Sequence, residues 1–213
     1  MNNKNEAQYA IFVSSSDNYS DIWNLFFDMF ARFWPEYKGT IYLQTQEKEY
    51  RHSQLNIICT KVGKRKHFGE TLRAGLDKVK EENILLFMID YMIMAKVDDE
   101  KMQRYYGFFS SNDCDTLRLR EERFLHYEDT TDSEIKRCLP PAEHRFFSYQ
   151  LAFWRKSKLV PMAYPHETPW SSEYYGDKRA HAIPLKLYSI KQDITPPHPL
   201  RFKGMPTSWK MAG

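Results

Sequence analysis

An α/β fold with a mainly parallel central sheet flanked by helices is the fold class that this sequence predicts. Residues 84–89 form a short, continuous run of large apolar side chains, which is typical of a strand buried on both faces. Upstream of this run, three more apolar segments alternate with two segments of helical periodicity. Because such alternation is typical of strand–helix–strand units, we expect the sheet to be mainly parallel.

The first of these units begins with a strand at residues 9–13 and a polar turn at residues 14–18. A helix is expected to start near Ser20 and Asp21, which suit the positive N-terminal end of a helix. Pro35 ends this helix, because proline lacks an amide hydrogen. The apolar positions between these limits recur at helical spacing: Ile22, Phe26, Met29 and Phe33.

Further elements are expected along the rest of the chain. A second helix, residues 68–82, carries apolar side chains on one face and leads into the strand at residues 84–89. From Pro161 onward the chain holds most of its prolines, so loops and short strands are expected in this Pro-rich C-terminal part. The remaining expected elements are strands at residues 40–43, 55–59, 116–119 and 146–154, and helices at residues 98–109 and 156–162.

Length, charge and cysteine content limit the class of protein. The 213 residues are expected to form a single domain, residues 1–213. Thirty-one basic residues against 28 acidic residues give a formal charge of only +3, which argues against a nucleic-acid partner. The three cysteines form no CxxC pair, and no apolar stretch approaches the roughly 20 residues of a membrane span. We therefore expect a cytoplasmic protein.

The end of the chain, residues 196–213, is basic and aromatic and contains no acid. Such a tail suits peripheral contact with the inner face of a membrane, and the more common alternative is an ordinary solvated segment. The residues concerned are Arg201, Phe202, Lys203, Trp209 and Lys210.

Several common catalytic motifs are absent from the sequence. No Gly-x-Gly-x-x-Gly follows the first strand and no phosphate-binding Gly-Lys-Ser/Thr loop occurs, which disfavours dinucleotide oxidoreductases and nucleoside triphosphatases. The seven histidines lack the spacing of zinc ligands, and no Gly-x-Ser-x-Gly elbow occurs. Nucleotide binding of another type is left open.

Asp90 and Tyr91 directly follow the apolar run at residues 84–89. The carboxyl edge of an open α/β sheet is where ligands bind, and an acid there suits a divalent cation and the phosphates it carries. The alternative is that the strand ends in a turn-forming Asp.

Two later segments also contain candidate site residues. Glu167 and Glu173 bracket a Pro169-Trp170 step, which equally describes the first turn of a helix. Within residues 150–155, Trp154 is either a ligand-stacking ring or a core anchor.

Taken in order, these segments resemble a family of small bacterial glycosyltransferases of capsular and surface polysaccharide synthesis with the GT-A nucleotide-sugar transferase fold. Residues 16–23 are similar to the family's Tyr-Ser-Asp-Leu-Trp segment, and residues 88–91 occupy the place of its Leu-Asp-Asp-Tyr, with Ile89 replacing the first acid. Residues 150–155 and 167–173 resemble its Gln-x-x-x-Trp-Arg and Glu-x-Pro-Trp-x-x-Glu segments. The match covers roughly residues 11–177.

The resemblance implies a GT-A-like domain whose residues 9–120 bind the nucleotide-sugar and whose residues 121–195 face the acceptor. It implies Mn²⁺ or Mg²⁺ at Asp90, with Glu173 as general base and Glu167 as second choice. The residues expected to contact the nucleotide or sugar are Ser14, Ser16, Asp17, Tyr91, Trp154 and Trp170.

The implied reaction is transfer of a sugar, with inversion, from a nucleotide-diphosphate donor to a hydroxyl acceptor. A UDP-sugar is the expected donor, and a glycan or lipid-linked molecule is the expected acceptor. Two alternatives remain open: a sugar-phosphate nucleotidyltransferase, and a non-catalytic glycan- or nucleotide-binding protein on the same fold.

Overall fold

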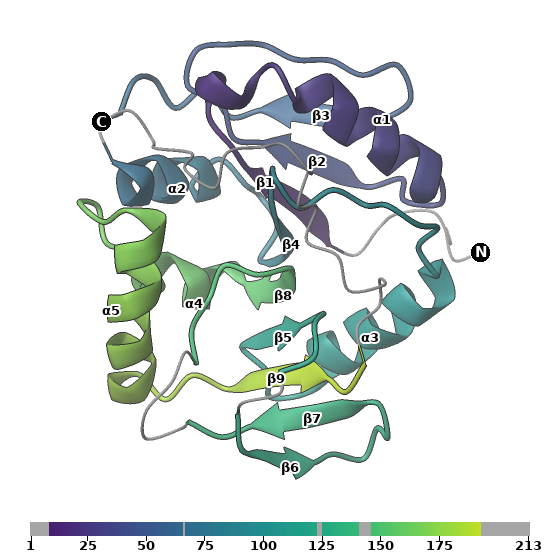
Figure 1. Cartoon of the computed structure of the whole chain (residues 1–213), viewed down its shortest axis with the longest axis vertical. Helices are drawn as coiled ribbons and strands as arrows, with labels where there is room; N and C mark the ends of the chain where they lie inside the picture. The colour runs from purple at the N-terminus through teal and green to yellow at the C-terminus, as the bar shows by residue number, and fades with distance from the viewer. Residues whose placement is uncertain (1–8, 66, 123–124, 141–145, 193–213) are drawn as a thin grey trace, which may run out of the picture.

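The computed structural model describes residues 9–65, 67–122, 125–140 and 146–192, which form one mixed α/β arrangement with a large central sheet and flanking helices (Figure 1). The strands are β1 Ala10–Ser14, β2 Thr40–Leu43, β3 Asn56–Cys59, β4 Asn83–Met88, β5 Thr116–Arg118, β6 Tyr127–Asp129, β7 Ile135–Cys138, β8 Ala152–Arg155 and β9 Leu187–Ile190. The α-helices are α1 Trp23–Phe33, α2 Phe68–Leu76, α3 Asp99–Ser111, α4 Lys156–Leu159 and α5 Pro169–Ala182, with 3₁₀ turns at Asp17–Tyr19 (η1) and Val160–Met162 (η2).

The described strands form one nine-stranded sheet in the order β3-β2-β1-β4-β8-β5-β9-β7-β6. Strands β3, β2, β1 and β4 are parallel, as the alternating pattern predicts. Beyond β4 the sheet is mixed, because β8 and β7 run against their neighbours. Strands β5 and β9, which pair in parallel, again run in the direction of β4.

The two central strands β1 and β4 are buried on both faces, as the continuous apolar run predicts. Alternate residues enter two different core clusters, because successive side chains of a strand point to opposite faces. Ile11 and Leu85 join the side chains of α1 and α3 on one face. Phe12 and Leu86 join those of α2, α4 and α5 on the other.

Helix α2 ends at Leu76 and not near residue 82, although the apolar pattern continues beyond it. The chain leaves α-helical hydrogen bonding there, since Lys78 and Val79 donate to the carbonyl oxygens of Gly75 and Leu76, three residues back. Val79 still packs in the same core cluster as Leu72 and Leu76. Periodic apolar burial therefore extends past the end of the helix.

The Pro-rich part contains a regular helix, which departs from the expectation of loops and short strands but agrees with the interpretation of Pro169 as the first turn of a helix. Helix α5 has 14 residues. Pro169 occupies its first turn, where a missing amide hydrogen costs no intrahelical bond, and Thr168 and Ser171 form a capping box. The strand expected at residues 146–154 is shorter in the structure, because regular pairing begins only at Ala152.

No helix among the described residues combines the length and apolar character that crossing a membrane requires.

Candidate functional site at the carboxyl edge of the sheet

The order in which the chain adds strands to the sheet reverses between β1 and β4. The chain builds outward from β1 through β2 and β3, then returns to place β4 on the other side of β1. Ser14 pairs with Met88 at the carboxyl ends of the two strands, and the Ile89 amide donates to the Ser14 carbonyl oxygen at 3.0 Å. Such a switch point is where open α/β sheets bind ligands.

The turn that follows β1 is held in place by two side chains from neighbouring elements. The Trp23 indole donates to the Ser15 hydroxyl at 2.8 Å, and the Gln44 amide donates to the Ser15 carbonyl oxygen at 2.7 Å. Ser14 and Ser15 are buried, and Ser16 is half-buried at the start of η1. The expected nucleotide contacts of Ser14 and Ser16 stay predictions.

Asp17 has a clear structural role at this turn. Its carboxylate accepts backbone N–H bonds from Gln46, Glu47 and Lys48 at 2.8, 2.9 and 3.0 Å. The side chain therefore fixes the loop after β2 against the turn after β1. These bonds occupy both carboxylate oxygens, which leaves Asp17 poorly suited to hold a cation.

Asp90 lies in the turn after β4 with its side chain exposed. Desolvation by the surrounding protein nevertheless raises its pKa above the ordinary value, against the opposing effect of its own backbone N–H. The pKa of Tyr19 is raised as well, by burial and then by the charge of Asp90, which places η1 beside this carboxylate.

A divalent cation would find few protein ligands here. Among the described residues, no group of three or more His, Cys, Asp or Glu side chains is arranged to hold a metal ion. Asp90 offers one carboxylate, and the carboxylate of Asp17 is already occupied by backbone amides. The described residues therefore do not build a metal site of their own.

Arg120 is a candidate site residue that the sequence analysis missed. It follows β5, is half-buried, and donates from Nη1 to the Tyr91 hydroxyl at 2.8 Å. Its position directly after an expected strand is the one sequence signal that pointed to it. The order of the strands, which decides that the ends of β4 and β5 lie near each other, is not visible in the sequence.

Gln150 lies between the ends of β4 and β5. Strand β8 pairs with both, and the Leu119 amide continues the pairing to the Leu151 carbonyl oxygen at 2.9 Å. Extending the two registers by two residues places Gln150 between Met88 and Arg120. Its Oε1 atom is buried without a partner, as is the hydroxyl of Ser148. Buried polar atoms without partners are uncommon in folded proteins and call for a ligand or water.

Glu167 is engaged in an ion pair. Arg179 donates to both of its oxygens, at 2.7 and 2.8 Å, and the Tyr164 amide donates to it at 3.2 Å. Desolvation alone would raise the pKa of Glu167, but hydrogen bonds from Arg179 and Ser172 outweigh it and lower the pKa. A carboxylate held in this way is a weak base, which makes Glu167 an unsuitable second choice for the proton acceptor.

Glu173 is half-buried on α5 and accepts a hydrogen bond from the Tyr149 amide at 2.9 Å. One turn later, Asp177 accepts from the Phe147 amide at 2.5 Å. The two carboxylates thus fix the segment that leads to Gln150 and β8. Glu173 consequently contacts the residue next to Gln150 and belongs to the half of the chain expected to face the acceptor.

The two tryptophans expected to stack on a sugar have opposite environments. Trp154 is 1% exposed and packs in the core, so it presents no face to a ligand. Trp170 is 64% exposed in the first turn of α5. Of these two tryptophans, Trp170 alone therefore exposes a ring on which a sugar can stack.

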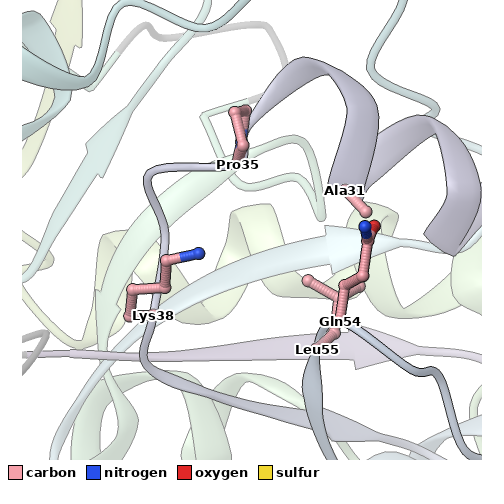
Figure 2. A pocket seen from close by; sticks show the side chains of 5 residues that line it. All are labelled: Ala31, Pro35, Lys38, Gln54 and Leu55. Atoms are coloured by element: carbon pink, nitrogen blue, oxygen red, sulfur yellow. The ribbon is translucent and has the colours of Figure 1, made fainter.

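Two surface pockets lie apart from the β1–β4 switch point. One, of about 330 Å³, lies between the end of α1 and the segment before β3, at the amino edge of the sheet (Figure 2). Its lining residues are Ala31, Pro35, Lys38, Gln54 and Leu55. The other, of about 380 Å³, lies beside the start of β7 and the end of β9.

Comparison with known proteins supports the fold. No family model matches the chain, and no curated protein matches it in sequence. Among solved structures, residues 1–349 of TarS from S. aureus match with a TM-score of 0.52 and 12% identity, over 87% of this chain and 58% of that one. The bifunctional IspDF from Campylobacter jejuni matches with a TM-score of 0.47 and 10% identity, over 87% of this chain and 49% of that one. The chain thus has a fold of the type found in TarS and spans about half to three-fifths of these chains.

Proposed function

We propose that this protein is a glycosyltransferase of the GT-A type, which moves a sugar from a nucleotide-diphosphate donor to a hydroxyl group. One observation carries the proposal: the carboxyl edge at the β1–β4 switch point brings together the turn after β1, Asp90, Tyr91 and Arg120. The fold shared with TarS, a glycosyltransferase, supports it.

The chemistry of sugar transfer explains why these residue types are needed. The bond from the anomeric carbon to the diphosphate breaks, and its electron pair remains on the diphosphate oxygen. The acceptor oxygen forms the new bond and loses its proton. Glu173 is the proposed proton acceptor, because its carboxylate holds the segment that leads to Gln150 and the carboxyl edge, whereas the pKa of Glu167 is lowered, despite desolvation, by its pair with Arg179.

The finer features of the proposal follow from this assignment and from the resemblance. A base that activates the acceptor directly implies inversion at the anomeric carbon. Trp170 supplies an exposed ring for a sugar. A UDP-sugar donor, a glycan or lipid-linked acceptor and a role in surface polysaccharide synthesis in the cytoplasm are parts of the same proposal. The expected dependence on Mn²⁺ or Mg²⁺ is a separate question, which chelation tests.

A donor screen tests the proposed function. The full chain is incubated with UDP-, GDP-, ADP- and CMP-sugars and a set of glycan acceptors, and nucleotide release and glycan mass are measured with Mn²⁺ and with EDTA. We expect release of one nucleotide together with a mass gain of one sugar. Formation of a nucleotide-sugar from a nucleoside triphosphate and a sugar phosphate would instead establish a nucleotidyltransferase. Binding without turnover by any donor would establish a non-catalytic binding protein.

A further inference from the structure

We infer that Arg120 binds the diphosphate of the donor, so that a guanidinium and not a protein-held metal ion supplies the positive charge at the leaving group. This inference rests on the proposed function and deepens it. The ligand class is a nucleoside diphosphate, whether free or joined to a sugar.

The topology brings Arg120 to the switch-point edge. Strands β4 and β5 run in the same direction on the two sides of β8, so their carboxyl ends lie at one edge. Tyr91 follows β4 and Arg120 follows β5, and their side chains meet across the start of β8. The guanidinium therefore lies beside the turn that carries Asp90.

The Arg120 guanidinium has more N–H donors than its described hydrogen bond uses. An arginine side chain offers five N–H donors in a planar fork, and Arg120 uses one of them, for Tyr91. Within the described ranges it has no carboxylate partner. Its neighbour two residues earlier differs: Arg118 is 2% exposed and is bound by Glu122 and by the Phe146 carbonyl oxygen. Arg118 thus stabilises the fold, whereas the remaining N–H groups of Arg120 are available to a ligand.

The chemistry of the edge favours an anion with several oxygens. Arginine binds phosphate oxygens in pairs, and such charge-assisted hydrogen bonds are about twice as strong as neutral ones. Among the described residues, the acids of this edge form no ion pair with Arg120: the Asp17 carboxylate accepts three backbone amides, and Asp90 is exposed in the turn after β4. Tyr91 orients the fork, which makes it a positioning residue.

The test compares ligands that differ only in phosphate. Isothermal titration in EDTA first identifies which of UDP, GDP, ADP and CDP binds the wild-type chain most tightly. The affinities of the wild type and the variants are then measured for that nucleoside diphosphate and for the matching nucleoside. We expect Arg120→Gln to weaken diphosphate binding about 10- to 100-fold and to leave nucleoside binding unchanged. Arg120→Lys should recover part of the loss, because it restores charge without the fork.

Two further variants keep the test decisive. Tyr91→Phe, which preserves the ring and releases Arg120, should weaken diphosphate binding about three- to tenfold. Arg32→Gln, an exposed cation at the end of α1, is the matched control and should change nothing. Diphosphate binding by Arg120→Gln equal to that of the wild type, or wild-type binding that requires Mn²⁺, overturns the inference and leaves the proposed function standing. Absence of binding by any nucleotide, with or without Mn²⁺, overturns the proposed function itself.

Discussion

At the scale of single residues, neighbours separate the roles of two similar acids. Glu167 and Glu173 lie six positions apart in the sequence and have different described contacts. Arg179 donates to both oxygens of Glu167, whereas Glu173 accepts a hydrogen bond from the Tyr149 amide. The sequence analysis ranked Glu173 first, and the environment of Glu167 now gives a physical reason for that order.

Replacement of Glu173 by glutamine should abolish sugar transfer and preserve the fold. The amide oxygen of Gln can still accept from the Tyr149 N–H, but it cannot take a proton from an acceptor. We expect transfer to fall at least 100-fold, within the usual effect of a general base, with an unchanged melting temperature. Glu167→Gln is the comparison, and transfer abolished by Glu167→Gln alone would show that the base is wrongly assigned.

The Glu167–Arg179 pair should make stability depend on pH. The pKa of Glu167 in the folded chain is lowered from its ordinary value of 4.5, so the folded state binds this proton more weakly than the unfolded state. The stabilisation is therefore complete above pH 4.5 and is lost as the pH falls through the folded pKa. Urea unfolding should show that Glu167→Gln costs about 2 kcal/mol at pH 7 and less at pH 3. Glu100→Gln, at an exposed position of α3, should show no such difference.

At the scale of elements, a close approach of backbones joins α2 to the segment before α5. The Gly69 amide donates to the Glu167 carbonyl oxygen at 3.2 Å, and the Glu70 amide donates to that of Pro165 at 3.0 Å. A Cβ atom on Gly69 would overlap the Tyr164 carbonyl oxygen. Glycine is needed here for lack of space, and the contact fixes the start of α5 beside the start of α2.

Alanine at two helical glycines should therefore have opposite effects. Gly69→Ala should destabilise the protein by about 2 to 3 kcal/mol, because backbone must move to admit the methyl group. Gly107→Ala, in α3, should stabilise it by about 0.5 to 1 kcal/mol, because a Cβ there meets no atom within 4 Å and alanine favours helix. Urea unfolding of both variants measures the two signs, and a neutral Gly69→Ala would show that α2 and the segment before α5 are not in close contact.

At the scale of the whole molecule, the sheet has two parts with different tasks. The parallel part, β3 to β4, supplies the switch point and the turn after β1. The mixed part, β8 to β6, lies beside β4 (Figure 1). It brings Arg120 and the segment held by Glu173 to the same edge. The expected division into a donor-binding half and an acceptor-facing half stays a prediction, with Arg120 at its boundary.

The basic and aromatic tail, residues 196–213, lies outside the described residues and is open to a direct test. Both core clusters close among the described residues, which end at residue 192, and we expect deletion of the tail to leave the melting temperature unchanged. If the tail contacts membranes, the deletion should also reduce sedimentation with vesicles that contain anionic lipid, and high salt should reduce it in the full chain. Equal sedimentation of both chains would show that the tail is an ordinary solvated segment.

Local patterns were sufficient for much of the first half of the chain. The apolar run before Asp90, the strands at β1 and β2 and the helix that ends before Pro35 are visible because burial on one or two faces dictates which positions are apolar. Helix α5 was predicted only at its start, as one of two interpretations of residues 167–173, because proline density was otherwise taken as a sign of loops. Strands β6, β7 and β9 were missed, although β2 is no longer than β7 or β9, because each of the three missed strands includes polar or charged residues and none forms a continuous apolar run.

The candidate site was likewise predicted only where its features depend on neighbouring residues in the sequence. That an acid follows the central buried strand is a property of neighbouring residues, and the sequence determined it. That Arg120 meets Tyr91, that Trp154 is enclosed in the core and that Arg179 neutralises Glu167 were decided only by tertiary structure. The physical reason is that these contacts join segments separated by 12 or more residues or depend on the position of β8 between β4 and β5. Apolar periodicity reports burial along one segment and carries no information on the order of the strands.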